Sequence, residues 1–175
     1  MLQTIIKKIP LIALLLLLCC VFNYASCKYS FRDASPIPAE VKTFRVNYLE
    51  NKAQFVNAQL SPQLTESLKR KIINITRLKQ TNEDDAHYDI SGYVSQYYPS
   101  TVNITNNATS TNRLNIGFHL IFKNTLDPTK NFEVDITRYE DFSAQLTLSD
   151  AESSLTPRIV TGIVDEIFNK IFSNW

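Results

Sequence analysis

The sequence predicts an α+β fold in which two helices pack on one face of a four-stranded, mostly antiparallel sheet, in the order β-α-β-β-β-α. Four segments alternate apolar and polar residues as strands do, and two longer segments repeat apolar residues with the period of a helix. Behind a leader-like start, the 175-residue chain keeps about 150 residues, which is the size of one domain. We therefore expect a single folded domain.

The first strand and the first helix are predicted from two different spacings of their apolar residues. Residues 42–49 alternate apolar and polar side chains, which predicts a strand. Residues 62–77 carry apolar side chains at near-helical spacing, which predicts an amphipathic helix. Ser61 is a favourable N-cap and Pro62 a favourable first helical residue. A polar loop, 80–86, should follow the helix.

Three further strands are expected at residues 87–98, 112–123 and 131–139, each apolar on one side and mainly polar on the other. Gly92 marks a bulge or a close contact in the first of them. Residues 99–112, rich in Asn and Thr, are expected to form a long polar hairpin loop, which is either functional or a tip without a partner.

The last segment predicts a second helix with one apolar stripe. Ser149 and Glu152 have the spacing of a capping box at its start. Pro157 interrupts the pattern, so we expect either a kink or a restart with Thr156 as a second N-cap.

Composition excludes several classes of function. The 18 Lys and Arg residues nearly balance 17 Asp and Glu, so wrapping of nucleic acid is not expected. Three isolated glycines provide no phosphate-binding loop. His87 and His119 lack partners at metal-ligand spacing, so neither a metal site nor another cofactor is expected. The acidic run 83–85 fits a solvated loop better than a weak cation site.

The N-terminus predicts export. Two lysines precede an apolar run, 9–22, that is shorter than the ~20 residues of a membrane-spanning helix, so residues 1–26 are expected to be a signal peptide. Small residues, Ala25 and Ser26, precede Cys27, as in bacterial lipoproteins whose cysteine is lipidated after cleavage. A spare cysteine behind an ordinary cleavage site is the alternative. We expect a lipidated linker over 27–41 and the domain over 42–175.

Several short motifs, taken in order, are similar to those of one family. They are Tyr-Ser-Phe at 29–31, Ser-x-Ile-Pro at 35–38, Lys-Thr-Phe at 42–44, Ser-Pro-Gln-Leu-Thr at 61–65, Asn-Arg-Leu-Asn-Ile at 112–116 and the C-terminal segment 167–175. Together they resemble the lipopolysaccharide-assembly lipoprotein LptE family, in its divergent short branch, over nearly all of the mature chain. The resemblance implies a non-enzymatic plug inside the outer-membrane β-barrel LptD. Such a plug helps the barrel assemble and contacts lipopolysaccharide, and Cys27 would be its lipidated residue.

The uncovered face of the sheet is the expected contact with the barrel, because barrel interiors are polar. On this face the alternation places Tyr93, Tyr97, Arg113, Asn115, His119, Glu133 and Asp135. The candidate partner-interface residues are Tyr93, Tyr97, Asn112, Arg113 and His119, together with the 99–112 loop. The candidate phosphate contacts to lipopolysaccharide are Arg113, Lys123 and Arg138, although each could be an ordinary surface cation.

Two other functions stay open at this point. A free-standing periplasmic binding module would hold a small apolar ligand between the helices and the sheet, and would need an internal cavity. An enzyme would need a cleft in which His87 or His119 is paired with a carboxylate.

Overall fold

The computed structural model describes residues 37–105 and 108–173. The expected signal peptide and Cys27 lie outside these residues, as does most of the linker. No helix in the described part of the chain is long and apolar enough to span a membrane.

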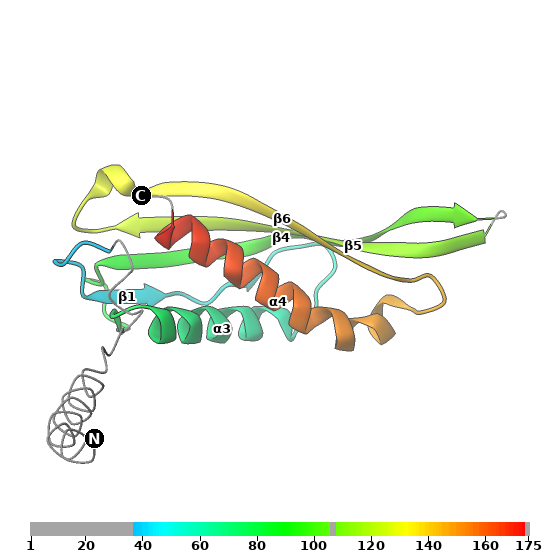
Figure 1. The fold of residues 1–175 in the computed structure, drawn as a ribbon, viewed down its shortest axis with the longest axis horizontal. Helices are drawn as coiled ribbons and strands as arrows, with labels where there is room; N and C mark the ends of the chain where they lie inside the picture. The colour runs from blue at the N-terminus through cyan, green and yellow to red at the C-terminus, as the bar shows by residue number, and fades with distance from the viewer. Residues whose placement is uncertain (1–36, 106–107, 174–175) are drawn as a thin grey trace, which may run out of the picture. The chain divides into compact units, whose positions relative to one another are not determined.

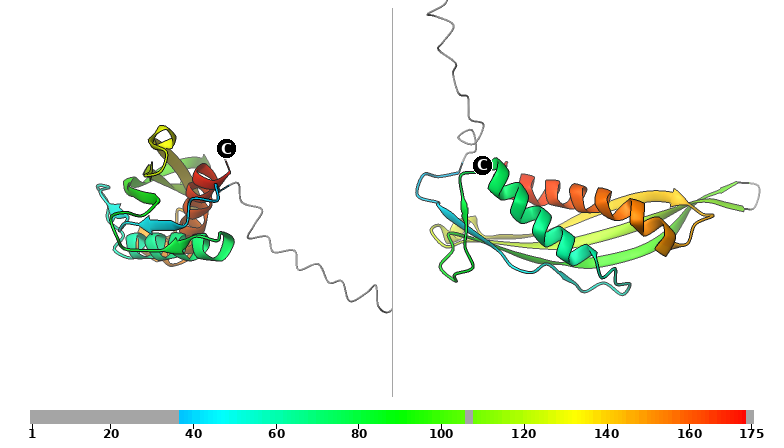
Figure 2. Two further views of the ribbon diagram at one scale, coloured as in Figure 1. Left: turned by 90° about the vertical axis from the view of Figure 1, so that its left-hand side faces the viewer. Right: turned by 90° about the horizontal axis from the view of Figure 1, so that it is seen from below.

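Two helices cover one face of a sheet, so the predicted α+β class is confirmed (Figure 1). Seen from below, both helices lie in front of the strands (Figure 2). The elements are β1 (Thr43–Val46), β2 (Glu50–Asn51), α3 (Leu60–Ile75), β3 (Lys79–Gln80), β4 (Tyr88–Thr105), β5 (Ala108–Asn124), a 3₁₀ turn η2 (Pro128–Lys130), β6 (Phe132–Ser143) and α4 (Leu148–Phe172).

The sheet is mixed and has six strands in the described residues, rather than four mostly antiparallel ones. Its order is β3-β1-β4-β5-β6, and β2 also pairs with β4. Strands β1 and β2 run parallel to β4, because α3 carries the chain back before β4 begins. Strands β2 and β3 have only two residues each, which is too short for a periodic sequence signal.

The expected hairpin loop at 99–112 is wrong, because strands β4 and β5 continue through most of it. Their pairing runs from Ser100 with Arg113 to Thr105 with Ala108. Strand β6 ends at the level of Thr111, so beyond that point β4 and β5 pair only with each other. We call residues 102–105 and 108–110 the hairpin extension; these residues project past β6 and α4 (Figure 1).

Both helix starts differ from their expected positions. Helix α3 begins at Leu60 with Gln59 as its N-cap, which makes no side-chain capping bond, and Ser61 lies inside the first turn. Ser61 is therefore not the N-cap.

Helix α4 is capped by Thr147, whose hydroxyl accepts a bond from the Asp150 N–H (3.2 Å) and donates to the Asp150 carboxylate (2.6 Å). The capping box thus starts two residues before Ser149, and Glu152 is not its second member. Helix α4 also continues through Pro157 as one element, so the expected restart at Thr156 is wrong.

The core lies between the helices and the sheet and is filled by apolar side chains. Leu68 of α3, Phe118 of β5 and Ile167 of α4 are completely buried. Gly92 makes the expected close contact, because a Cβ atom there would lie 2.7 Å from the Phe118 ring and 2.4 Å from the His119 carbonyl oxygen. The Phe118 ring occupies the space that any larger residue at position 92 would need.

Candidate interaction surface

The uncovered face of the sheet carries a row of interacting side chains across three strands. Tyr93 of β4, His119 of β5 and Asp135 of β6 are neighbours in the strand register. The rings of Tyr93 and His119 are 5.1 Å apart, and the Lys52 ammonium lies 4.6 Å from the Tyr93 ring centroid. A cation at that distance from an aromatic ring is attracted to it, so the row is ordered before any partner binds.

His119 is held between two carboxylates on β6. Its Nδ1 lies 2.7 Å from Asp135 and its Nε2 lies 3.3 Å from Glu133. The hydrogen bond to Asp135, with that to Glu133, raises the pKa of His119 above its ordinary value of about 6.5. The His119 ring can therefore keep its proton at a higher pH than a free histidine, between two carboxylates that balance its charge.

A second group of side chains lies closer to the hairpin extension. Arg113 donates two hydrogen bonds to Asp141, of 2.7 and 3.0 Å, and its guanidinium lies 3.9 Å from the Tyr139 ring. These bonds hold the pKa of Asp141 below its usual range. Tyr139 itself is 58% exposed. The arginine is thus held over a tyrosine ring that solvent or a partner can reach.

The two groups give the face one chemical character. Several of its charged groups are paired within the face, while tyrosine rings stay accessible, and tyrosine is enriched where proteins meet. Tyr98, which sequence reasoning missed, is 43% exposed and lies in register with Asn115. Such a face suits contact with another polar protein surface.

Tyr97 does not belong to this face, and its expected position there is wrong. The register shifts between Val94 and Gln96, so one residue of β4 bulges and the alternation reverses. Tyr97 therefore points toward the helices and is only 2% exposed. The hydrophobic pattern did not reveal the bulge, because tyrosine occupies both position 97 and position 98.

The three expected phosphate contacts are not brought together. Arg138 lies on the helix side of β6, opposite Ile116, and its guanidinium pairs with Glu166 of α4 at 3.5 Å. The expectation that it shares a surface with Arg113 is wrong. Lys123 is exposed, but it lies toward the opposite end of β5 from Arg113.

Asn112 also lies on the helix side of β5, where it is in register with Phe142. Tyr93, Arg113 and His119 are the candidate interface residues that the structure gathers on the uncovered face.

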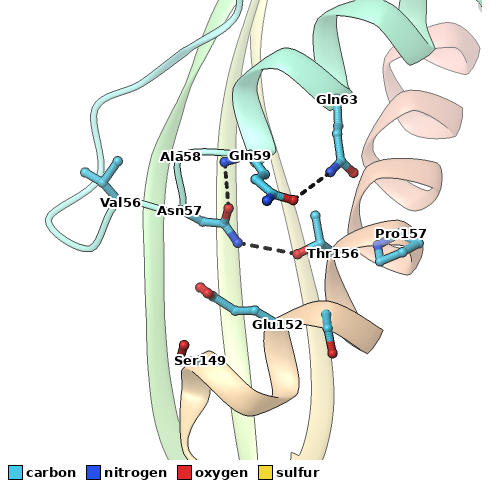
Figure 3. A pocket seen from close by; sticks show the side chains of 10 residues that line it. Val56, Asn57, Ala58, Gln59, Gln63, Ser149, Glu152, Thr156 and Pro157 are labelled. Atoms are coloured by element: carbon cyan, nitrogen blue, oxygen red, sulfur yellow. Dashed lines mark hydrogen bonds between the residues drawn. The ribbon is translucent and has the colours of Figure 1, made fainter.

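A polar pocket of about 410 Å³ opens between the first turns of α3 and α4 (Figure 3). Asn57, which is 8% exposed, donates weakly to Thr156 and to the Tyr97 hydroxyl, both at 3.4 Å. The Tyr97 hydroxyl donates in turn to Glu152. These polar groups bond mainly to each other and tie α4 and the loop before α3 to β4.

The sequence of residues 41–171 matches the family model described as LptE, lipopolysaccharide-assembly. The chain belongs to the LptE family. The resemblance found in the short motifs is therefore confirmed. The match covers every strand and nearly all of both helices. Searching the curated proteins with this sequence gives no significant match.

Solved structures share the fold of this LptE-family chain. A hypothetical protein from Chlamydia trachomatis has 8% identity and a TM-score of 0.50, over 76% of this chain and 99% of its own. A protein from Xanthomonas campestris has 11% identity and a TM-score of 0.50, over 76% and 86%. A minor lipoprotein from Acinetobacter baumannii has 15% identity and a TM-score of 0.49, over 75% and 92%. At such identities the first two show a common fold and nothing more.

Proposed function

We propose that this LptE-family chain is an outer-membrane lipoprotein that plugs an LptD-type β-barrel, helps it assemble and assists insertion of lipopolysaccharide into the outer leaflet. A lipid on Cys27 anchors it, and the domain lies on the periplasmic side within the barrel lumen. The family match and the lipoprotein-like N-terminus support this proposal.

The observation that carries the proposal is the uncovered face of the sheet. Several of its charged groups are already paired, as in Arg113 with Asp141 and His119 with Asp135, so a polar lumen wall that covers them would have fewer charges left to satisfy. The exposed ring of Tyr139 supplies contact area on the same face. The hairpin extension continues this face beyond the helices and would reach further along the wall (Figure 1).

The role is structural and involves no catalysis. His119 is paired with carboxylates, as an enzyme would require, but it lies on an open sheet surface rather than in a cleft. His87 does not fit an enzyme either, because its Nδ1 already accepts a hydrogen bond from the Lys42 N–H at 2.9 Å. A free-standing module for an apolar ligand is also disfavoured, because completely buried side chains such as Leu64 and Phe118 fill the space between helices and sheet.

Contacts to lipopolysaccharide are proposed at Arg113 and Lys123 on the uncovered face. Arg113 would bring a guanidinium whose charge is shared with Asp141, whereas Lys123 has no ion pair among the described residues. A phosphate would therefore gain more from Lys123. Arg138 is left out of this proposal because Glu166 and α4 hold it on the other side of the sheet.

Recovery of the native lipoprotein from detergent-solubilised envelopes tests the proposal. A large β-barrel should be recovered with the unmodified chain, and Tyr93→Asp combined with a shortened hairpin extension should reduce its amount. Arg70→Asp, on the exposed side of α3, is the matched control and should change nothing. Mass spectrometry should find lipid on Cys27; an unmodified thiol there would contradict the anchor.

A further inference from the structure

The polar pocket between the first turns of α3 and α4 contains a carboxylate that lacks a cationic partner within the described chain (Figure 3). Among the described residues that line this pocket, Glu152 is the charged one. One oxygen of its carboxylate accepts the hydrogen bond from Tyr97, and the described residues form no other hydrogen bond and no salt bridge to Glu152. Because a partly buried carboxylate attracts an opposite charge more strongly than one in bulk water, a cation that enters this pocket gains an attraction that the chain itself leaves unused.

Buried neighbours hold this carboxylate in place before any ligand binds. The hydroxyl of Tyr97, a residue that is almost fully buried, donates to it at 2.7 Å. Asn57 and Thr156 are also buried and line the pocket, and the oxygen of Asn57 accepts from the Gln59 N–H at 2.9 Å. In Figure 3 the Glu152 side chain extends toward Asn57. A ligand therefore meets a preformed site, which lowers the entropic cost of binding.

The lining of the pocket defines the chemistry of its ligand. The Glu152 carboxylate repels an anion such as phosphate, and the described residues contain no group of ligands that could hold a metal ion. Gln63 donates to Gln59 through its side-chain nitrogen at 3.4 Å, which leaves its oxygen as an acceptor, and the Ser149 hydroxyl is a further polar group. Ammonium and guanidinium groups carry a positive charge and several donors, so they fit this set of oxygens.

The rim of the pocket favours a protein as the source of the cation. Val56 lines it and is 67% exposed, and Ala58 and Pro157 add apolar surface. The aliphatic stems of lysine and arginine pack against such surface while their charged ends reach polar groups. Phe55, which precedes Val56, is exposed as well. A polypeptide beside the pocket would cover both residues, whereas a small free amine would leave them in water.

We propose that this pocket receives a basic side chain, an arginine or a lysine, from a protein partner. The cationic end pairs with Glu152, which Tyr97 holds in position, and the stem packs against Val56 and Pro157. This inference rests on the proposed function, which supplies the barrel protein as the partner, and it adds a contact on the helix side of the domain to those on the uncovered face of the sheet.

Glu152→Gln removes the charge and keeps an oxygen that can accept from Tyr97. The half-time for loss of the barrel protein from the immobilised full-length lipoprotein should shorten about tenfold, as expected when one partner of a charged pair is neutralised. Glu166→Gln is the matched control, because it makes the same change on the same helix outside this pocket. Glu166 also has an ion pair to lose, with Arg138, so its variant should be no more stable to urea and should still retain the barrel normally.

A photo-cross-linking residue at position 153, which is exposed and lines the pocket, locates the partner's basic residue. Its adduct should map to the barrel protein, next to an arginine or a lysine. Changing that basic residue to glutamate should speed loss of the barrel as Glu152→Gln does. Combining that change with Glu152→Arg should restore retention, because the pair is then present with its charges exchanged.

The outcomes separate this inference from the proposed function. If the unmodified chain recovers no barrel, both fail. If it recovers the barrel, but Glu152→Gln retains it as long as Glu166→Gln does, the inference alone is overturned. An adduct with glycolipid instead of protein, or a charge exchange that does not restore retention, also overturns it.

Discussion

The hydroxyl of Tyr97 donates a 2.7 Å hydrogen bond to the carboxylate of Glu152, joining β4 to the second turn of α4. Burial, together with the nearby carboxylate, raises the pKa of Tyr97, so the hydroxyl stays protonated and can act as the donor. The bulge after Val94 creates this bond, because without it Tyr97 would point to the opposite face of the sheet.

Tyr97→Phe should therefore lower the free energy of unfolding by about 1–2 kcal/mol, since it removes a bond to a charged acceptor and keeps the ring. Urea denaturation of the signal-free domain measures this. Tyr93→Phe is the control, because the Tyr93 hydroxyl makes no hydrogen bond in the described part of the chain. Equal stability of the two variants would show that the hydrogen bond to Glu152 makes no net contribution to the free energy of unfolding.

Gly92→Ala should destabilise the domain by about 1–3 kcal/mol through overpacking. The new Cβ would meet a backbone oxygen, that of His119, at 2.4 Å, and a backbone atom cannot rotate away. Gly117→Ala provides the comparison, because its nearest contact is the Ser95 hydroxyl at 2.9 Å, which can rotate away, and the Gln96 Cβ at 3.1 Å has to shift by only a few tenths of an ångström. We expect a clearly smaller loss for position 117, and the reverse order would refute the close-approach argument.

Thr147→Ala should cost about 1 kcal/mol, as for other lost N-caps. The hydroxyl of Thr147 is the group that accepts from the first turn of α4, through the Asp150 N–H. Ser149→Ala should change the denaturation midpoint much less, because Ser149 is already inside the helix. A larger effect at position 149 would instead identify Ser149 as the N-cap, as the sequence pattern predicted.

The parts of the fold that the sequence predicted are the elements in which apolar residues recur at a regular spacing over many positions. Helices α3 and α4 were located because residues such as Leu68 and Ile167 recur on one face, and that face is the buried one. Strand β5 was located because its apolar residues alternate without interruption. Errors of two residues at the ends of α3, and of four at the start of β5, did not change which face is buried.

The predictions that failed concern local geometry, which produces no regular spacing of apolar residues in the sequence. A single extra residue after Val94 reversed the facing of Tyr97, and either facing was compatible with a tyrosine. Asn and Thr in the hairpin extension resemble a loop in composition, yet their backbone groups pair between strands. The hydroxyl of Ser61, which is buried and has no hydrogen-bond partner in the described part of the chain, could not be foreseen at all, because a serine before a proline is also what an N-cap looks like.

His119 should make stability depend on pH. Its pKa is raised in the folded domain, so its contribution is fully present below the unfolded value of about 6.5 and is lost as pH rises through the higher folded value. NMR titration of the ring should place the folded pKa above 6.5, and Asp135→Asn should lower it. Asp141→Asn, which removes the partner of Arg113 instead, should leave the His119 titration nearly unchanged.

Pro157→Ala should stabilise the domain. Pro157 lies inside α4, where it offers no N–H to the carbonyl four residues earlier, and proline in a helix interior is about 3 kcal/mol less favourable than alanine. Because the helix is continuous through this exposed position, we expect a gain of about 1–3 kcal/mol.

Pro62→Ala is the matched test of that reasoning. Pro62 is also exposed, but it lies in the first turn of α3, where the N–H would have no helical partner. Alanine there gains no hydrogen bond and frees the unfolded chain, so stability should stay level or fall by about 0.5 kcal/mol. If Pro157→Ala gave no more stability than Pro62→Ala, α4 would have to accommodate its proline without losing a backbone bond, for instance by accepting water at the Ser153 carbonyl.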